Sequence, residues 1–388
     1  MHNGDTSNLP RFKPVSCRLS DRFYSDTYFN RTQDTLHATG HDPRVRMQFF
    51  QRQDHACLCG IEEAVQLMTT LSDSHLSSLQ FHSLSDGERI DAGETMMIAE
   101  GPYSILAPLE TLLLGILARN TRVATNTSHC VRAAHGKPVF CFSARFDHYL
   151  MQPWDGYAYQ VGCRAAHREP FGVSSNAQGI WWSAQGIGTI PHGLIAAYGG
   201  DTIAATLAFA ETTAPDVPRI ALVDFTNDCV QATLDVAAAM LAKHQEQQDD
   251  RYLLQGVRLD TASDMVDASL QNSPDTKSQT GVCPELVWNV HRALTEQAGH
   301  YPDNSPEHRF YTDIDIIVSG GFTPARIKAF EAAGVPVAAY GVGSALFAGH
   351  YDFTADVVSL LENGEWRDCA KTGRQYNPNE RLQEWSNR

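Results

Sequence analysis

Long apolar runs are missing from this 388-residue sequence. The longest is Thr111 to Ala118 (TLLLGILA), far short of the roughly 20 residues that a membrane-spanning helix needs. The first residues, MHNGDTSNLPRFKP, also lack the apolar core of a secretory signal peptide. We therefore expect a cytoplasmic protein that does not interact with membranes.

Basic residues are few, because 30 Lys and Arg stand against 45 Asp and Glu, giving a formal net charge of -15. Binding to nucleic acid depends on counterion release at a basic surface, so this balance argues against a nucleic-acid or anionic-membrane partner. Any anionic ligand must be held by local groups. The proportions of hydrophobic residues (43%) and charged residues (19%) are typical of a folded globular protein.

Cysteines spaced as C-x-x-C pairs are also missing. The nine cysteines are an odd number without any C-x-x-C pair, which is typical of free thiols in a reducing compartment. Cys57 and Cys59 form a C-x-C on an expected strand, where the alternate spacing favours half-buried packing over metal binding. We expect no metal site made of protein ligands alone and no structural zinc.

The length favours two domains, and the pattern changes once along the chain. Residues 1–23 are polar and predict a loose arm. Residues 24–136 mix helical periodicity with short alternating runs and predict a small α/β domain. Residues 137–350 repeat the order strand, loop, helix, and residues 351–388 are expected to pack back on the N-terminal domain.

The repeated pattern after Lys137 predicts a parallel sheet. Six strand candidates each end in a polar or glycine-rich loop: PVFCFSAR, GIGTIP, RIALVDF, GVRLDT, DIIVSGG and VAAYGVG. Between them we expect helices at residues 193–211, 228–248, 285–297 and 324–334. This alternation indicates parallel strands, and the number of units favours closure into an α/β barrel, whose chemistry lies at the C-terminal ends of the strands.

Residues suited to chemistry lie at these expected strand ends. They are Arg145, His192, Asp224, Arg258, Asp260 and the loops Ser319-Gly320-Gly321 and Gly341-Val342-Gly343-Ser344. Two arginines, two carboxylates, a histidine and two glycine loops suit the binding of a polyanion. The glycine loops follow the last two strands, where barrels commonly bind phosphate through backbone N–H groups.

Each candidate also has a purely structural interpretation. Glycines end strands in many folds, and a single histidine after a strand, such as His192, is more often structural than catalytic. Asp224 and Asp260 could each cap a following helix. Arg258 could form an ion pair with Asp260 at the rim of the barrel. Convergence of the whole set on one face favours the functional interpretation.

Longer stretches resemble a known family, the nicotinate phosphoribosyltransferases. IIVSGGFTPARIKAFEAAGVPVAAYGVGSALF resembles its C-terminal phosphate-binding stretch, GVRLDT its arginine-x-aspartate strand and GTIPHG its histidine loop. DGERIDAGETMMIAEGPYSILAPLETLLLGILARNTRVAT is similar to its N-terminal domain, and YSDTYF to its tyrosine motif. The resemblance is closest to the shorter archaeal and bacterial branch. It implies an irregular TIM-like α/β barrel with a smaller N-terminal α/β domain, the type II phosphoribosyltransferase architecture.

The resemblance also implies catalytic roles. His192 would be the phosphorylated histidine that couples ATP hydrolysis to synthesis. Arg258 and Asp260 would hold the ribose and phosphates of phosphoribosyl pyrophosphate (PRPP), and Asp224 would lie near the pyrophosphate and its Mg²⁺.

Substrate-binding roles follow from the same resemblance. The glycines of the last two strand-end loops would cradle the 5-phosphate, with Ser319 and Ser344 beside them: Gly320, Gly321, Gly341 and Gly343. Phe142 and Arg145 would meet the pyridine ring and its carboxylate. Tyr28 would reach over from a neighbouring subunit, which implies a homodimer or a higher homo-oligomer.

The sequence departs from the family at the expected substrate pocket. Phe146 stands where many relatives have a second basic residue directly after Arg145, and Trp181 and Trp182 either remodel the pocket or pack. The expected function is ATP-coupled synthesis of nicotinate mononucleotide and pyrophosphate from nicotinate and PRPP. Decarboxylating quinolinate phosphoribosyl transfer, a nicotinamide substrate, and non-catalytic binding of PRPP or nucleotide remain open as alternatives.

Overall fold

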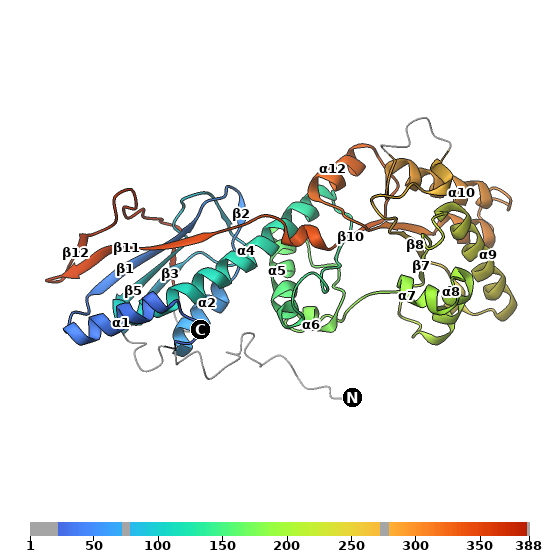
Figure 1. Ribbon diagram of the computed structural model, residues 1–388. Coiled ribbons are helices and arrows are strands. Elements are labelled where there is room, and N and C mark those ends of the chain that lie inside the picture. The colour runs from blue at the N-terminus through green and yellow to red at the C-terminus, as the bar shows by residue number, and fades with distance from the viewer. Residues whose placement is uncertain (1–21, 72–77, 272–278, 386–388) are drawn as a thin grey trace.

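The computed structural model describes residues 22–71, 78–271 and 279–385. Within these residues the chain forms two α/β units, and one long helix, α4 (Glu110–Ala133), runs from the first unit into the second (Figure 1). The polar arm expected at residues 1–23 lies outside the described residues except at its last two positions.

The first unit contains an antiparallel sheet built from both ends of the chain. Its strand order is β12-β11-β1-β5-β3-β13. The strands are β1 (Arg44–Gln51), β3 (Gln80–Ser83), β5 (Met97–Pro102), β11 (Phe353–Glu362), β12 (Glu365–Asp368) and β13 (Gln383–Glu384). Strand β11 pairs with β1, so residues 353–362 complete a sheet that begins some 300 residues earlier in the chain.

Helices cover this sheet because their apolar residues recur at helical spacing. In α2 (Ile61–Leu71), Ile61, Ala64, Val65 and Met68 are buried at positions i, i+3, i+4 and i+7. Helix α1 (Thr27–Thr39) is more polar and ends where Gly40 takes a left-handed φ of 67°. The unit also contains α3 (Tyr103–Leu106) and the short pair β2 (Ala56–Cys57) and β4 (Arg89–Ile90).

Helix α4 continues well beyond the apolar run at residues 111–118, because residues 119–133 contain neither glycine nor proline. Its buried face there consists mainly of small residues, which lets α5 (Gln152–Ala165) approach closely. A Cβ on Gly162 of α5 would lie 2.7 Å from Thr127 Cβ of α4. The two helices therefore form the junction between the units.

The second unit contains the predicted parallel sheet. Its strand order is β6-β10-β9-β8-β7, and the described pairs are parallel. The strands are β6 (Val139–Cys141), β7 (Ile220–Leu222), β8 (Gly256–Leu259), β9 (Asp315–Val318) and β10 (Ala339–Val342). Single bridges from Cys141 to Val173 and from Val173 to Gly186 continue the curve beyond β6. The predicted α/β architecture is confirmed. The described strands form a curved parallel sheet, which is consistent with an irregular barrel.

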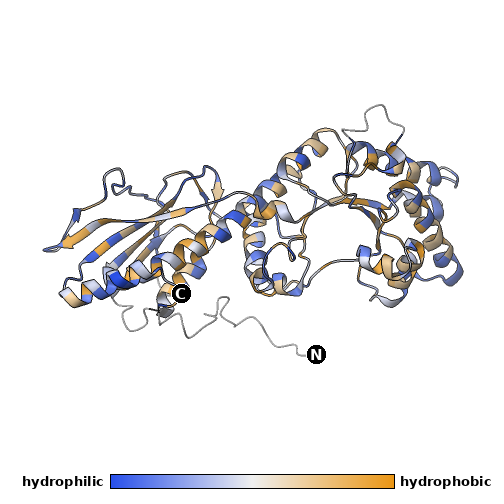
Figure 2. Cartoon of the chain, in the orientation of Figure 1, coloured by the Kyte–Doolittle hydropathy of each residue, from blue (hydrophilic) through white to orange (hydrophobic). Residues whose placement is uncertain are grey.

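Helices surround this curved sheet (Figure 1). They are α8 (Thr202–Thr212), α9 (Cys229–Gln247), α10 (Pro284–Ala298), α11 (Pro306–Thr312) and α12 (Pro324–Ala332). The strands of the sheet are strongly apolar and the outer turns of α9 are hydrophilic (Figure 2). This distribution buries the largest core cluster between the strands and the helices.

One expected strand is not formed. Residues 186–191 (GIGTIP) contribute only the single bridge at Gly186, and the following residues run as an irregular segment. Two glycines weaken a strand and Pro191 has no N–H to donate, so the apolar spacing was misleading here. The segment still reaches β8, because Arg258 Nη2 donates to the Ile190 carbonyl (3.2 Å).

The single helix expected at residues 193–211 is two helices, α7 (His192–Ala197) and α8. Gly199 and Gly200 separate them with φ values of 69° and 88°, which helical residues do not adopt. Asp201 then caps α8 by accepting from Ala204 N.

Two half-buried carboxylates join the units at the α5 surface. Trp154 Nε1 donates to Glu63 Oε1 (2.8 Å), and Tyr157 Oη donates to Asp86 Oδ2 (2.8 Å). Burial raises the pKa of Glu63 to about 7 and that of Asp86 to about 6. The junction therefore holds two groups that titrate above their ordinary range.

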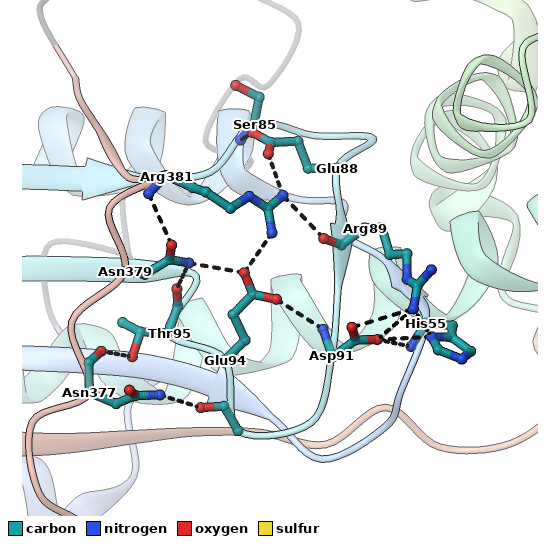
Figure 3. A network of polar contacts seen from close by, with 11 residues as sticks. His55, Ser85, Glu88, Arg89, Asp91, Glu94, Thr95, Asn377, Asn379 and Arg381 are labelled. Carbon is teal, nitrogen blue, oxygen red and sulfur yellow. Dashed lines mark hydrogen bonds and ion pairs between the residues drawn. The ribbon is translucent and has the colours of Figure 1, made fainter.

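The C-terminal residues are fastened to the first unit by a polar network, which we call the C-terminal clasp (Figure 3). Arg381 donates to Glu94 Oε1 (2.6 Å) and to Glu88 Oε2 (2.7 Å). Asn379 Nδ2 donates to Glu94 Oε1 (3.0 Å), and His55 and Asp91 form a second ion pair nearby.

Among the helices of the described residues, we find none with the length and apolar character needed to span a membrane.

Candidate active site

The polar candidates gather at one edge of the parallel sheet, because each follows or ends a strand that runs in the same direction. Asp224 lies two residues after β7, Asp260 follows β8 directly, Ser319 follows β9 directly, and Gly343 follows β10 directly. In α/β folds this is the edge where ligands bind. We call these residues, with Arg258 and His192, the strand-end site.

Ser319 connects Arg258 and Asp260. Its hydroxyl donates to Asp260 Oδ1 (2.7 Å) and accepts from Arg258 Nη1 (3.1 Å), and its side chain is buried. The guanidinium is also 3.5 Å from Asp260 Oδ2, so the ion pair considered from the sequence is present but long. Arg258 and Asp260 thus keep contact area for a ligand, with 18% and 23% of their side chains exposed.

His192 and Asp224 form a second pair at this edge. His192 Nε2 lies 3.0 Å from both carboxylate oxygens, and its ring is tilted over Phe225 with centroids 6.4 Å apart. The histidine is 45% exposed and the carboxylate only 6%. If Nε2 carries the ring proton and donates a hydrogen bond to the carboxylate, Nδ1 carries the lone pair. This is the arrangement of an oriented nucleophile or base.

Burial raises the pKa of Asp224, and the charge of Asp260 raises it further, whereas the hydrogen bond and charge of His192 lower it. The effect of Asp260 on Asp224 indicates that the two carboxylates share one region of the site. Neither carboxylate accepts a helix-capping hydrogen bond in the described residues, and the cap of α9 is Asp228 instead.

Gly320 and Gly321 turn the chain sharply after β9. Both have left-handed φ values, 86° and 71°, which favour glycine. A Cβ on Gly320 would lie 3.4 Å from Asp260 Oδ1, so the turn also packs against the neighbouring strand end. The turn leads into α12, whose first residue is Pro324 and whose cap is Thr323.

The glycines after β10 have a packing role. A Cβ on Gly341 would lie 2.5 Å from two ring carbons of Phe142, and one on Gly343 would lie 2.8 Å from the Phe142 carbonyl and closer to the Phe146 ring. These glycines let the β6 end lie against the β10 end. Ser344 then begins a short 3-10 turn, Ser344–Phe347.

The residues after β6 present aromatic rings beside this glycine loop. Phe142 is half-buried and stacks on Phe140, with centroids 6.1 Å apart. Arg145 is exposed, and its guanidinium lies 5.7 Å from the centroid of the Phe146 ring. Arg145 has no hydrogen-bond partner among the residues that the structure describes, so its donors are available to an anion.

Tyr28 is not brought to the strand-end site within one chain. It is 59% exposed on α1, which lies on the side of the first unit that faces away from the parallel sheet (Figure 1). Trp181 and Trp182 pack instead of shaping the site. Trp181 lies against Trp154, and Trp182 Nε1 donates to the Gln178 carbonyl.

The site also contains possible ligands for a metal ion. Among the described residues no group of three or more His, Cys, Asp or Glu is arranged around a cation. Cys57 and Cys59 are both buried, rather than half-buried as the alternate spacing predicted. Asp224 and Asp260 fit Mg²⁺, which commonly takes one or two carboxylates and completes its shell with substrate phosphates and water.

Sequence reasoning missed Arg326. It lies in the first turn of α12, and its Nη1 donates to the carbonyls of Gly320 (2.7 Å) and Gly321 (3.3 Å). A basic residue five positions after a glycine pair and inside a helix start was the available signal, because such a charge opposes the helix dipole.

Comparison with known proteins agrees with this geometry. Residues 26–121 match the family model for the quinolinate phosphoribosyl transferase N-terminal domain. A nicotinate phosphoribosyltransferase of Bacillus subtilis is 24% identical over 383 residues, 90% of this chain and 69% of that protein. A nicotinate phosphoribosyltransferase of Mycobacterium tuberculosis is 28% identical over 282 residues, which are 71% of this chain and only 52% of that protein.

A solved structure has the same overall fold. The nicotinate-nucleotide pyrophosphorylase of Pyrococcus furiosus superposes with a TM-score of 0.73 at 26% identity, covering 95% of this chain and 82% of that one. The fold is that of the type II phosphoribosyltransferases. Within it, the similarity to these relatives supports the nicotinate phosphoribosyltransferase family for this chain.

Proposed function

We propose that the protein is a cytoplasmic nicotinate phosphoribosyltransferase that couples ATP hydrolysis to the synthesis of nicotinate mononucleotide. The observation that carries this proposal is the convergence of Arg258, Asp260 and the Gly320-Gly321 turn with the His192–Asp224 pair. The first three groups suit a sugar bearing phosphates, and the pair suits phosphoryl transfer to a histidine.

In the proposed reaction the pyridine nitrogen of nicotinate attacks the anomeric carbon of PRPP. The C–N bond forms with the nitrogen lone pair, and the C–O bond to pyrophosphate breaks with its electrons leaving on the pyrophosphate oxygen. No proton has to move, so the protein's tasks are positioning and charge neutralisation. Arg258 would bind the phosphates, Asp260 the ribose hydroxyls, and the Gly320-Gly321 turn the 5-phosphate.

Mg²⁺ would neutralise charge on the leaving pyrophosphate, and Asp224 and Asp260 are the residues suited to hold it. Arg145 would pair with the nicotinate carboxylate, whose planar shape a guanidinium matches, and Phe142 would meet the ring. The residues at the ends of β9 and β10 would line the phosphate region: Ser319, Gly341, Gly343 and Ser344.

ATP coupling would begin at His192. Its Nδ1 would attack the terminal phosphorus of ATP, ADP would leave, and water would later hydrolyse the phosphohistidine. Asp224 would hold the ring by accepting from Nε2 and would stabilise the charged imidazole.

We also propose a two-fold dimer in which Tyr28 acts in the partner's site. The exposed position of Tyr28, remote from the strand-end site of its own chain, supports this arrangement.

One alternative keeps specific support. The N-terminal domain model that residues 26–121 match is that of quinolinate phosphoribosyl transferase, whose reaction would require decarboxylation and recognition of two carboxylates. The exposed Phe146 beside Arg145 favours a substrate with one carboxylate.

A substrate panel tests the proposal. Purified protein with PRPP and Mg²⁺ is offered nicotinate, nicotinamide or quinolinate, with and without ATP, while pyrophosphate, ADP and carbon dioxide are measured. We expect pyrophosphate with nicotinate, and ADP release that depends on nicotinate. Carbon dioxide from quinolinate would establish the alternative, nucleotide from nicotinamide would change the substrate, and PRPP binding without any pyrophosphate would indicate a non-catalytic binder.

A further inference from the structure

Arg326 binds backbone carbonyls where an ion pair would be expected. Its guanidinium donates to the carbonyls of Gly320, Gly321 and Val282, and it lies 4.4 Å from the centroid of the Phe322 ring. No carboxylate pairs with it among the residues that the structure describes. Burial lowers the pKa of Arg326.

The position of Arg326 adds to this imbalance. It is the third residue of α12, where the unpaired N–H groups already produce a positive potential. A cation in the first helical turn is unfavourable unless an anion lies nearby. The strand-end site contains two carboxylates, Asp224 after β7 and Asp260 after β8, and the hydrogen bonds of these carboxylates go to His192 and Ser319 and not to Arg326.

The carbonyl contacts fix the direction of two peptide N–H groups. A trans peptide points its C=O and its N–H in opposite directions. Because the Gly320 and Gly321 carbonyls point at Arg326, the N–H groups of Gly321 and Phe322 point away from it. Neither group donates a hydrogen bond within the described part of the chain. Gly321 is exposed, whereas Phe322 is buried, where donors are normally paired.

We propose that Arg326 is a positioning residue for phosphate: it locks the Gly320-Gly321 turn with its N–H groups facing the ligand and supplies the positive charge behind it. The inference rests on the proposed function in that the ligand is the 5-phosphate of PRPP. An anion at the turn would satisfy the unused donors and balance both the guanidinium and the start of α12.

Two substitutions separate positioning from charge. Arg326→Gln keeps a donor for one carbonyl and removes the charge, and Arg326→Lys keeps the charge but cannot contact two carbonyls in a fork. Lys328→Gln is the matched control, because it removes a positive charge from an exposed position of the same helix.

We expect Arg326→Gln to raise the KM for PRPP on the order of tenfold, with kcat changed less than about twofold and the KM for nicotinate unchanged. Arg326→Lys should give an intermediate KM, and Lys328→Gln should match the unmodified protein. Calorimetric binding of PRPP alone, without nicotinate or ATP, should weaken in the same order. This binding measurement remains informative if Arg326→Gln does not fold, because Arg326→Lys provides the second variant.

Unchanged PRPP affinity in the folded variants would overturn the inference, as would equal changes in the KM values of both substrates, which would indicate general distortion. If the unmodified protein binds PRPP through Arg326 but forms no nucleotide, the proposed function fails and the inference stands. If the unmodified protein does not bind PRPP, both fail.

Discussion

The strand-end site and the C-terminal clasp contain the same kinds of residue but use them differently. In the clasp, Arg381 contacts Glu88 and Glu94 at 2.7 and 2.6 Å, and Asn379 and a backbone N–H also contact Glu94 (Figure 3). In the strand-end site, Arg258 lies 3.5 Å from Asp260. The clasp satisfies its charges internally, whereas the strand-end site leaves donors for a ligand.

The histidines repeat this contrast. His55 in the clasp and His192 in the strand-end site each lie against an aspartate, at 2.9 and 3.0 Å. Asp91 is 49% exposed, and contacts with His55 and Arg89 lower its pKa. Asp224 is buried, and its pKa is raised. A histidine–carboxylate contact alone therefore does not identify chemistry, but a buried carboxylate with an accessible ring nitrogen does.

The histidine contrast gives the largest expected effect. His192→Ala should abolish nicotinate-dependent ATP hydrolysis and leave slow nucleotide synthesis at high substrate concentrations, because the histidine couples energy without bonding to the pyridine. His55→Ala should leave ATP hydrolysis unchanged. Release of ADP measures both. Normal ADP release by His192→Ala would remove this residue from the mechanism.

The arginine contrast comes next. Arg258→Lys should lower kcat/KM on the order of a hundredfold, because an ammonium cannot make the forked contact of a guanidinium with phosphate oxygens. Arg381→Lys, which keeps a charge between Glu88 and Glu94, should stay within about twofold of the unmodified enzyme. Steady-state kinetics with PRPP as the varied substrate measure both. Equal kinetics for the two variants would show that Arg258 is structural.

Glycines with similar backbone strain allow a finer comparison. Gly320 has a φ of 86° in the strand-end site, and Gly364 has a φ of 85° between β11 and β12. Alanine at either position should cost about 1 kcal/mol of stability. Only Gly320→Ala should also raise the KM for PRPP, by roughly tenfold, because it disturbs a turn that we assign to phosphate. Thermal unfolding and kinetics of both variants separate strain from binding.

The sequence predicted the strand ends well, because hydrophobic strands followed by polar residues give a clear local signal. Asp224, Arg258 and Ser319 lie at the ends or within the strands expected for them. The error at residues 186–191 came from the same signal, since alternating apolar residues do not reveal that two glycines and a proline prevent pairing. His192 is nevertheless close to Asp224 through a loop.

Contacts between distant segments could not be predicted from local patterns. The packing of Gly341 against Phe142 and the bonds from Arg326 to glycine carbonyls depend on how neighbouring strands and helices meet. The clasp joins residues about 290 positions apart, as between Arg381 and Glu94. Such contacts carry no sequence periodicity, so they appear only in the folded chain.

The half-buried carboxylates at the α5 junction give a smaller, pH-dependent prediction. Burial raises the pKa of Glu63 from 4.5 to about 7, so between these values the folded protein keeps a proton that the unfolded chain has released. Its contribution to stability is present below about pH 4.5 and is lost as the pH rises through about 7. Glu63→Gln should therefore remove part of this loss, on the order of 1 to 3 kcal/mol.

Thermal unfolding measured from pH 5 to pH 8 checks the junction prediction, because this range lies above the ordinary pKa of 4.5 and spans the raised pKa of about 7. Glu94→Gln is the matched control, because Glu94 is paired with Arg381 in the C-terminal clasp. The Glu63→Gln profile should be flatter than that of the control. Parallel profiles would show that Glu63 does not titrate in this range.

The smallest expected effect concerns the clasp itself. Arg381 is 46% exposed, and exposed ion pairs contribute at most about 1 kcal/mol each because water and salt screen them. Arg381→Ala should therefore lower the free energy of unfolding by about 1 kcal/mol, with a smaller difference at high salt. Its kinetics should equal those of the unmodified enzyme, since Arg381 contacts Glu88 and Glu94 of the first unit and the strand-end site lies in the second. A large loss of PRPP affinity in Arg381→Ala would contradict the contrast between the clasp and the strand-end site. The clasp, a network of the first unit, would then influence ligand binding in the second unit.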